Sequence, residues 1–131
     1  MSYKILILFL VLAIAAAAYA FKNADINGNS EFISKDRINS SDVVIRQTEN
    51  GYEPSEVTVK KGTRVVFLNE TKNEIWPASN LHPTHNIFPE FDPKQPFGAG
   101  TAWGFVFQKT GEWKFHDHLR PNRQGVVKVT D

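Results

Sequence analysis

One segment near the end of the chain carries two histidines, His116 and His118, separated by a single residue. Trp113 and Phe115 alternate with more polar residues, a pattern typical of a β-strand, in which successive side chains point to opposite faces. Both histidines therefore lie on the face opposite the two aromatic residues, with their backbones about 7 Å apart. Two imidazoles at this spacing can reach one metal ion.

A second cluster, His82-Pro-Thr-His85, contains the only other histidines, since the chain has four histidines and no cysteine. Four imidazoles form a nitrogen-rich ligand set, which suits copper(II) and, less selectively, zinc(II) or nickel(II). We therefore predict one metal site that draws on both clusters. The alternative is that both clusters are polar surface loops.

Three acidic residues lie near the histidines in the sequence. Glu90 and Asp92 can serve as oxygen ligands, or can accept the second ring N–H of a ligating histidine and fix its tautomer. The alternative is a solvated acidic loop. Asp117 lies between the two strand histidines and, by alternation, faces the aromatic side, where a buried carboxylate needs a partner. Arg120 or Arg123 is the expected partner.

Short apolar runs punctuated by turn residues predict an all-β domain with no helix. Turns are marked by Asn50-Gly51, Lys61-Gly62 and Thr110-Gly111. Strands in such a series pack as an antiparallel sandwich or barrel, with alternating aromatic residues in the core. The expected strands are residues 43–48, 57–59, 64–69, 101–107, 113–117 and 126–129.

The segment of residues 70–100 interrupts this series. It contains five prolines, so it cannot form a central strand over its whole length. Long irregular segments inside a compact domain usually carry function, and this one carries His82 and His85. Trp76, in the same segment, either shields the metal from water or closes one end of the sandwich.

The start of the chain has the pattern of an export signal. Lys4 precedes an apolar run over residues 5–21, and Ala18 and Ala20 are the small residues that signal peptidase requires. We expect residues 1–20 to be a signal peptide or, if uncleaved, an N-terminal membrane anchor. Residues 21–42 are polar and without period, which predicts a tether. A single domain would then occupy residues 43–131.

Composition excludes several classes of function. The chain has 15 lysines and arginines against 14 aspartates and glutamates, so it offers no basic field for a nucleic acid. Without cysteine it has neither disulfides nor thiolate ligands. No nucleophile with an orienting triad is identifiable, which leaves nucleophilic catalysis without support.

The segments with these features resemble the cupredoxin family. Gly51-Tyr52-Glu53-Pro54 and residues 57–69 are similar to the first half of that domain, and His85-Asn86 to its first copper ligand and the asparagine that follows. Residues 111–115 and 125–129 resemble its last two strands. The resemblance covers residues 43–131 and implies a Greek-key β-sandwich, a copper ligand at His85 and a plastocyanin-like role in electron transfer.

The chain departs from the family at the other ligands. Counted from Gly111, the cysteine ligand of the family falls on Asp117, and its downstream histidine and methionine fall near Arg120 and Arg123. Met1 is the only methionine. A thiolate-based blue copper centre is therefore excluded.

A second resemblance, to multicopper oxidases, accounts for the histidines themselves. Residues 115–118 look like the aromatic-His-x-His element of those enzymes, and residues 82–85 like the start of a His-Pro-x-His-x-His element that lacks its third histidine at Ile87. A three-copper cluster needs a second domain, or a symmetric oligomer that brings sites together. The resemblance thus implies copper ligation at His85, His116 and His118, with His82 as a fourth ligand or a supporting group.

Together these patterns predict an exported, periplasmic or extracellular, copper-binding protein with a non-blue mononuclear site. It would act in copper binding, delivery to a partner protein, or electron transfer to a redox partner, and would contact a membrane only through an uncleaved N-terminal segment. One alternative is a small copper-dependent oxidoreductase that acts on superoxide, peroxide or dioxygen. Another is a metal-free interaction module.

Overall fold

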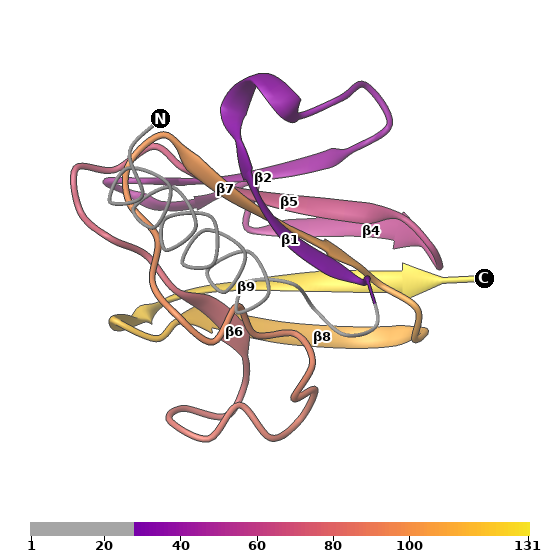
Figure 1. Ribbon diagram of the computed structural model, residues 1–131. Coiled ribbons are helices and arrows are strands. Elements are labelled where there is room, and N and C mark those ends of the chain that lie inside the picture. Colours follow the sequence, from indigo (N-terminus) through magenta and orange to yellow (C-terminus); the bar gives the residue numbers. More distant parts are fainter. Residues whose placement is uncertain (1–27) are drawn as a thin grey trace, which may run out of the picture.

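Nine β-strands and one short 3₁₀ turn make up the part of the chain that the computed structural model describes, residues 28–131 (Figure 1). One sheet has five strands in the order β1-β7-β5-β2-β3, and the other has four in the order β4-β9-β8-β6. The predicted all-β sandwich is confirmed. The elements are β1 (Ser30–Ser34), η1 (Lys35–Arg37), β2 (Val43–Thr48), β3 (Gly51–Glu53), β4 (Glu56–Lys60), β5 (Arg64–Asn69), β6 (Pro77–Ser79), β7 (Thr101–Val106), β8 (Gly111–Asp117) and β9 (Arg120–Thr130).

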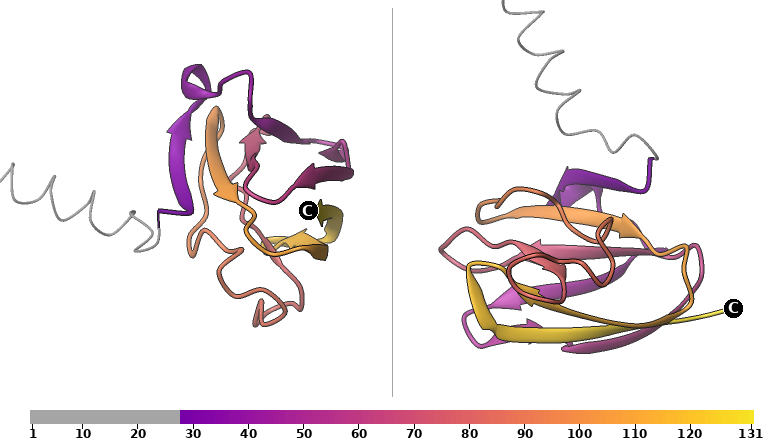
Figure 2. Two further views of the ribbon diagram at one scale, coloured as in Figure 1. Left: turned by 90° about the vertical axis from the view of Figure 1, so that its right-hand side faces the viewer. Right: turned by 90° about the horizontal axis from the view of Figure 1, so that it is seen from below.

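Two strand pairs depart from the antiparallel arrangement that the sequence predicts. β2 runs parallel to β5, and β4 runs parallel to β9. A parallel pair needs a long crossover connection. Between β2 and β5 the crossover consists of β3 and β4, and between β4 and β9 it consists of most of the domain. Both crossovers include strands of the two sheets, because the chain goes from one sheet to the other and back (Figure 2).

The strands at residues 43–48 and 64–69 have the predicted bounds, and the other four predicted strands are present with ends that differ by up to several residues. Two short strands were not predicted in the domain, β3 and β6. β6 lies at the edge of its sheet. Pro77 is tolerated there because a proline has no backbone N–H to donate, and on an edge strand no carbonyl of a neighbouring strand is left without a donor.

The predicted tether is wrong for residues 30–34, which form β1. This strand pairs with β7 from Ser30 opposite Phe105 to Ser34 opposite Thr101. Its apolar residues are the neighbours Phe32 and Ile33, which pack on opposite faces, Phe32 against the main core and Ile33 against a smaller cluster. Because these two neighbouring residues contact apolar clusters on opposite faces, β1 lacks the alternating pattern of a strand with one buried face.

Glu31 of β1 also forms an ion pair with Arg64, whose guanidinium donates two hydrogen bonds of 2.7 Å to the carboxylate of Asp42.

The predicted signal peptide or anchor, residues 1–20, lies outside the described residues. Within residues 28–131 no helix is long and apolar enough to cross a membrane.

Aromatic rings from both sheets fill the space between them. The ring centroid of Phe67 lies 5.2 Å from that of Phe115 and 5.8 Å from that of Trp103. Phe88 and Phe91, from the long segment between β6 and β7, are buried in the same core. Burying these two side chains ties the proline-rich segment to the sandwich, since each buried phenylalanine contributes about 1.5–3 kcal/mol.

Gly125 in β9 is required by the packing of Phe115. A Cβ atom at this position would meet the Phe115 ring, with Cε1 at 2.7 Å, and the carbonyl oxygen of Ser55 at 2.8 Å. Gly125→Ala should lower the free energy of unfolding by about 1–3 kcal/mol, as overpacking of a core does. Urea denaturation measures this. Gly98→Ala, where a Cβ meets no atom within 4 Å, is the control; equal losses in both variants would contradict the packing argument.

Candidate metal centre

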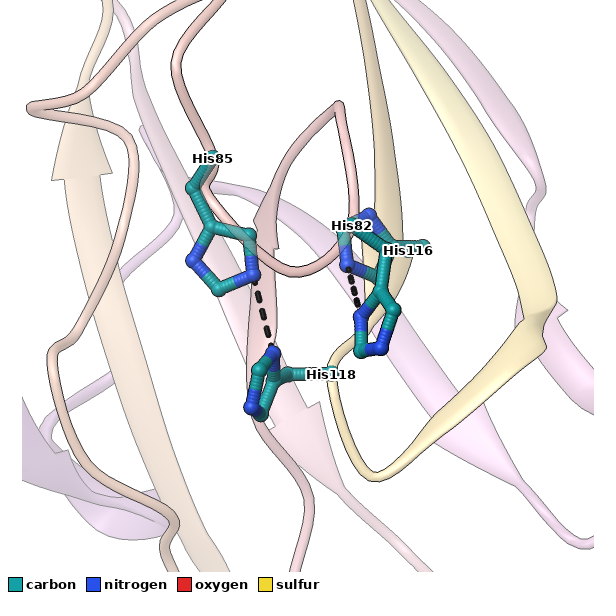
Figure 3. Close-up of side chains that lie close together, drawn as sticks. All are labelled: His82, His85, His116 and His118. Carbon is teal, nitrogen blue, oxygen red and sulfur yellow. Dashed lines mark hydrogen bonds between the residues drawn. The ribbon is translucent and has the colours of Figure 1, made fainter.

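All four histidines converge at one point, although they come from two distant segments (Figure 3). If one ring nitrogen, Nδ1 or Nε2, is taken from each histidine, these four nitrogens all lie within 4.8 Å of one another. The structure therefore brings together the four residues that the sequence singled out, His82, His85, His116 and His118.

The end of β8 positions His116 and His118. His116 is paired with Ala78 of β6, and the ladder with β9 is irregular between His116 and Asp117. His118 follows the strand, and its backbone N–H donates to the carbonyl of Trp76 at 2.8 Å. The two imidazoles face the cluster, while the side chain of Asp117 between them is fully buried.

A tight turn positions His85. Its backbone N–H donates to the carbonyl of Leu81 at 2.6 Å, and Ile87 donates to the carbonyl of Asn80 at 2.9 Å. His85 has a φ of 54°, in the left-handed region that few residues other than glycine adopt. Together with the buried Phe88, this backbone shape directs the imidazole inward, where only 4% of the residue is exposed.

Hydrogen bonds fix the tautomers of the two most buried imidazoles. Nδ1 of His85 lies 2.7 Å from Oδ2 of Asp92, and Nδ1 of His116 lies 2.8 Å from Oδ1 of Asn80. Both partners are oxygen acceptors, so each Nδ1 carries the proton. The Nε2 lone pairs of His85 and His116 are therefore directed at the cluster.

The remaining two histidines meet these lone pairs. Nδ1 of His118 lies 3.0 Å from Nε2 of His85, and Nδ1 of His82 lies 3.3 Å from Nε2 of His116. Nitrogens bound to one metal ion at about 2.0–2.1 Å are separated by roughly 3–4 Å. These two pairs have that separation, and a small contraction brings all four nitrogens within it. The donor set fits a single metal ion.

Burial favours the neutral form of the two histidines from the end of β8, His116 and His118. The pKa of His116 is lowered from 6.5 to about 4, first by burial and then by the neighbouring His85, His82 and His118. Burial, followed by His85 and His82, also lowers the pKa of His118. Since only a neutral imidazole binds a metal ion, both side chains are ready to do so at neutral pH.

Asp92 supports the cluster from behind His85. Burial raises the pKa of its carboxyl, but the hydrogen bonds from His85, the Trp76 indole and the backbone of Lys94 together outweigh burial and lower it. The Trp76 and Lys94 bonds are each 2.8 Å long. Asp92 is thus an ionised group that orients a potential ligand, the role the sequence suggested for it as an alternative to ligation.

Trp76 lies beside the cluster and contacts two of its rings. The indole centroid is 4.6 Å from that of His118 and 6.3 Å from that of His85. The residue is half-buried. It therefore covers one side of the cluster while its N–H holds Asp92.

Asp117 and Glu90 lie outside the group of four histidines. The buried carboxylate of Asp117 accepts hydrogen bonds from Gln47, the backbone N–H groups of Trp76 and Leu119, and Arg120, at 2.8–3.1 Å. Arg120 is one of the two partners that the sequence predicts. Glu90 is exposed, and its carboxylate lies 3.6 Å from the amine of Lys109.

Two supporting residues were not predicted, Asn80 behind His116 and Gln47 behind Asp117. Asn80 lies only two positions before His82, and that proximity is the single sequence signal that could have indicated it. Gln47 has no such signal, since 70 positions separate it from Asp117.

Solved structures with the same fold are cupredoxins. A reduced Cu(I) form of an amicyanin mutant matches 78% of this chain and 99% of its own, at 16% identity and a TM-score of 0.66. Amicyanin from Paracoccus versutus matches 76% of this chain and 92% of its own, at 20% identity and a TM-score of 0.66. A purple cupredoxin from Nitrosopumilus maritimus matches 67% of this chain and 99% of its own, at 22% identity and a TM-score of 0.59.

At these identities the similarity shows the fold, so the predicted cupredoxin-like architecture is confirmed. No protein-family model and no curated protein sequence matches the chain.

The lowered pKa of His116 makes the metal-free protein sensitive to acid. Below pH 6.5 the unfolded chain protonates this residue, whereas the folded chain does so only near pH 4. Stability should therefore fall as the pH drops from 6.5 to 4, by about 2–3 kcal/mol from this group. Urea denaturation in the presence of a chelator, at pH 7.5 and 4.5, measures the loss. In His116→Gln the loss of unfolding free energy between the two pH values should be smaller than in the wild type, by about 2–3 kcal/mol. Equal losses in the two proteins would show that His116 does not cause the acid sensitivity.

Asp92→Asn should weaken metal binding by about 10 to 100-fold, the usual effect of losing the partner of a ligating histidine. An asparagine keeps an acceptor for Trp76 but can present its NH₂ to His85, which would then move its proton to Nε2 and block the lone pair. Calorimetric titration with Cu(II) measures the change. Glu90→Gln is the matched control and should bind as the wild type does; a larger effect in the control would make Glu90 the more important carboxylate.

Proposed function

We propose that this protein is an exported copper-binding protein with a mononuclear, histidine-rich, non-blue site, acting in copper delivery or one-electron transfer. The observation that carries the proposal is the convergence of four imidazole nitrogens on one point, with two tautomers fixed by Asp92 and Asn80. A surface loop needs no such arrangement. Isolated polar histidines would point to water and would not lie buried against one another.

Copper is the metal that this donor set favours. The ligands are all nitrogen, and copper(II) binds nitrogen donors more tightly than the other divalent ions of its row. Zinc accepts the same ligands and is the second choice. The likeness to amicyanin, of which a Cu(I) form is among the similar structures, supports copper.

The site differs from a blue copper centre because the chain contains no cysteine. The residue between His116 and His118 is Asp117, and its carboxylate is engaged by four hydrogen-bond donors on the core side. The intense absorption of a blue centre comes from a thiolate, so a copper form of this protein should be nearly colourless.

The residues around the site have separable tasks. His85 and His116 present lone pairs, and Asp92 adds negative charge beside a bound cation. Trp76 limits the access of water on one side. Bound copper would supply a one-electron Cu(II)/Cu(I) couple or would itself be the cargo.

The proposal is tested by titrating Cu(II) into the wild type and four single alanine variants. One ion per chain should bind. Replacement of His85, His116 or His118 should each cost far more affinity than replacement of His82, where we expect a loss of about 10 to 100-fold. Calorimetry gives the affinities.

Electron paramagnetic resonance of the loaded protein should show a tetragonal Cu(II) signal with nitrogen hyperfine structure. A narrow parallel hyperfine splitting of the blue type, or no uptake of copper at all, would refute the proposal. His82→Ala as the most damaging variant, with His116→Ala and His118→Ala silent, would show that the site is built differently.

A further inference from the structure

His82 is held less firmly than the other three histidines of the cluster. His85 and His116 are buried and His118 is half-buried, whereas His82 is exposed. It lies in a run of four consecutive exposed residues, from Leu81 to Thr84. Moving its side chain therefore uncovers little apolar surface and costs little free energy.

The hydrogen bonds behind the rings show the same difference. Nδ1 of His85 is held by Asp92 and Nδ1 of His116 by Asn80. His118 is held by its backbone bond to Trp76 and by ring contact with the Trp76 indole. Among residues 28–131, the hydrogen bond and the ring contacts of the His82 side chain are with other histidines: its Nδ1 lies 3.3 Å from Nε2 of His116, and its ring centroid lies 4.9 Å from that of His118.

The backbone around His82 can stay in place while its side chain moves. Two backbone hydrogen bonds hold the turn: the N–H of His85 donates to the carbonyl of Leu81, and the N–H of Ile87 donates to the carbonyl of Asn80. These bonds fix His85 independently of the His82 ring. A rotation about the side-chain torsions of His82 then breaks its contact with His116 and opens that side of the cluster.

We propose that His82 is the exchangeable ligand of the site, through which copper enters from and leaves to a partner with nitrogen or sulfur donors. In the transfer step, a donor of the acceptor forms a bond to the metal as the bond from His82 breaks, and the oxidation state does not change. His85, His116 and His118 hold the ion until further donors replace them. This inference rests on the proposed function and assigns the side of the site on which delivery takes place.

The experiment follows the transfer of Cu(II) from the loaded protein to EDTA by stopped-flow absorption. For the wild type, the rate should rise with the EDTA concentration, because the acceptor displaces His82 directly. His82→Ala should still bind one ion but transfer it about 10 to 100-fold faster, since a lost ligand bond appears mainly in the dissociation rate. Thr84→Ala, an exposed residue on the same turn, is the matched control and should transfer at the wild-type rate.

The outcomes separate the inference from the function on which it rests. If the wild type takes up no copper, the proposed function fails, and this inference with it. If the wild type binds one ion but His82→Ala transfers it at the wild-type rate, the inference alone is overturned. A wild-type transfer rate that does not change with the EDTA concentration would also overturn it, because the acceptor would then not displace His82 directly.

Discussion

The buried carboxylate of Asp117 is the constraint on which the arrangement of the histidine cluster depends. It lies between the two strand histidines and accepts hydrogen bonds from Gln47 of β2, the backbone before β6, and the turn that leads into β9. An unpaired charge at this depth would cost several kcal/mol. The four donors therefore hold three segments at the end of β8. The orientation of His116 and His118 follows from that fixed strand end.

Asp92 gives the other half of the cluster a matching support. It fixes the tautomer of His85 and accepts the indole N–H of Trp76, whose backbone N–H is bound to Asp117. Trp76 thus connects the two carboxylates that stand behind the two pairs of histidines. A cluster of imidazoles with a carboxylate near each half favours a cation at its centre, because the negative charges of the carboxylates attract a positive ion.

The proline-rich segment between β6 and β7 contains both a buried part and an exposed part. Phe88 and Phe91 anchor it in the aromatic core, so His85 reaches the cluster from a firmly held backbone. Leu81, His82, Pro83 and Thr84 are exposed on the same segment. The fold thereby places three more firmly held histidines and one exposed histidine in one cluster.

The sequence by itself determined the class of fold, the bounds of β2 and β5, the pairing of two histidine clusters and the absence of a thiolate. These features depend on composition and local alternation, which a single sequence displays. Only the tertiary structure decided that residues 30–34 belong to a sheet, that Asn80 and Gln47 stand behind His116 and Asp117, and that Asp92 orients His85. These are contacts between elements that packing brings together, such as Gln47 and Asp117 at a separation of 70 residues. Local periodicity carries no information about them, because it records which face of a strand is buried and not which strand covers it.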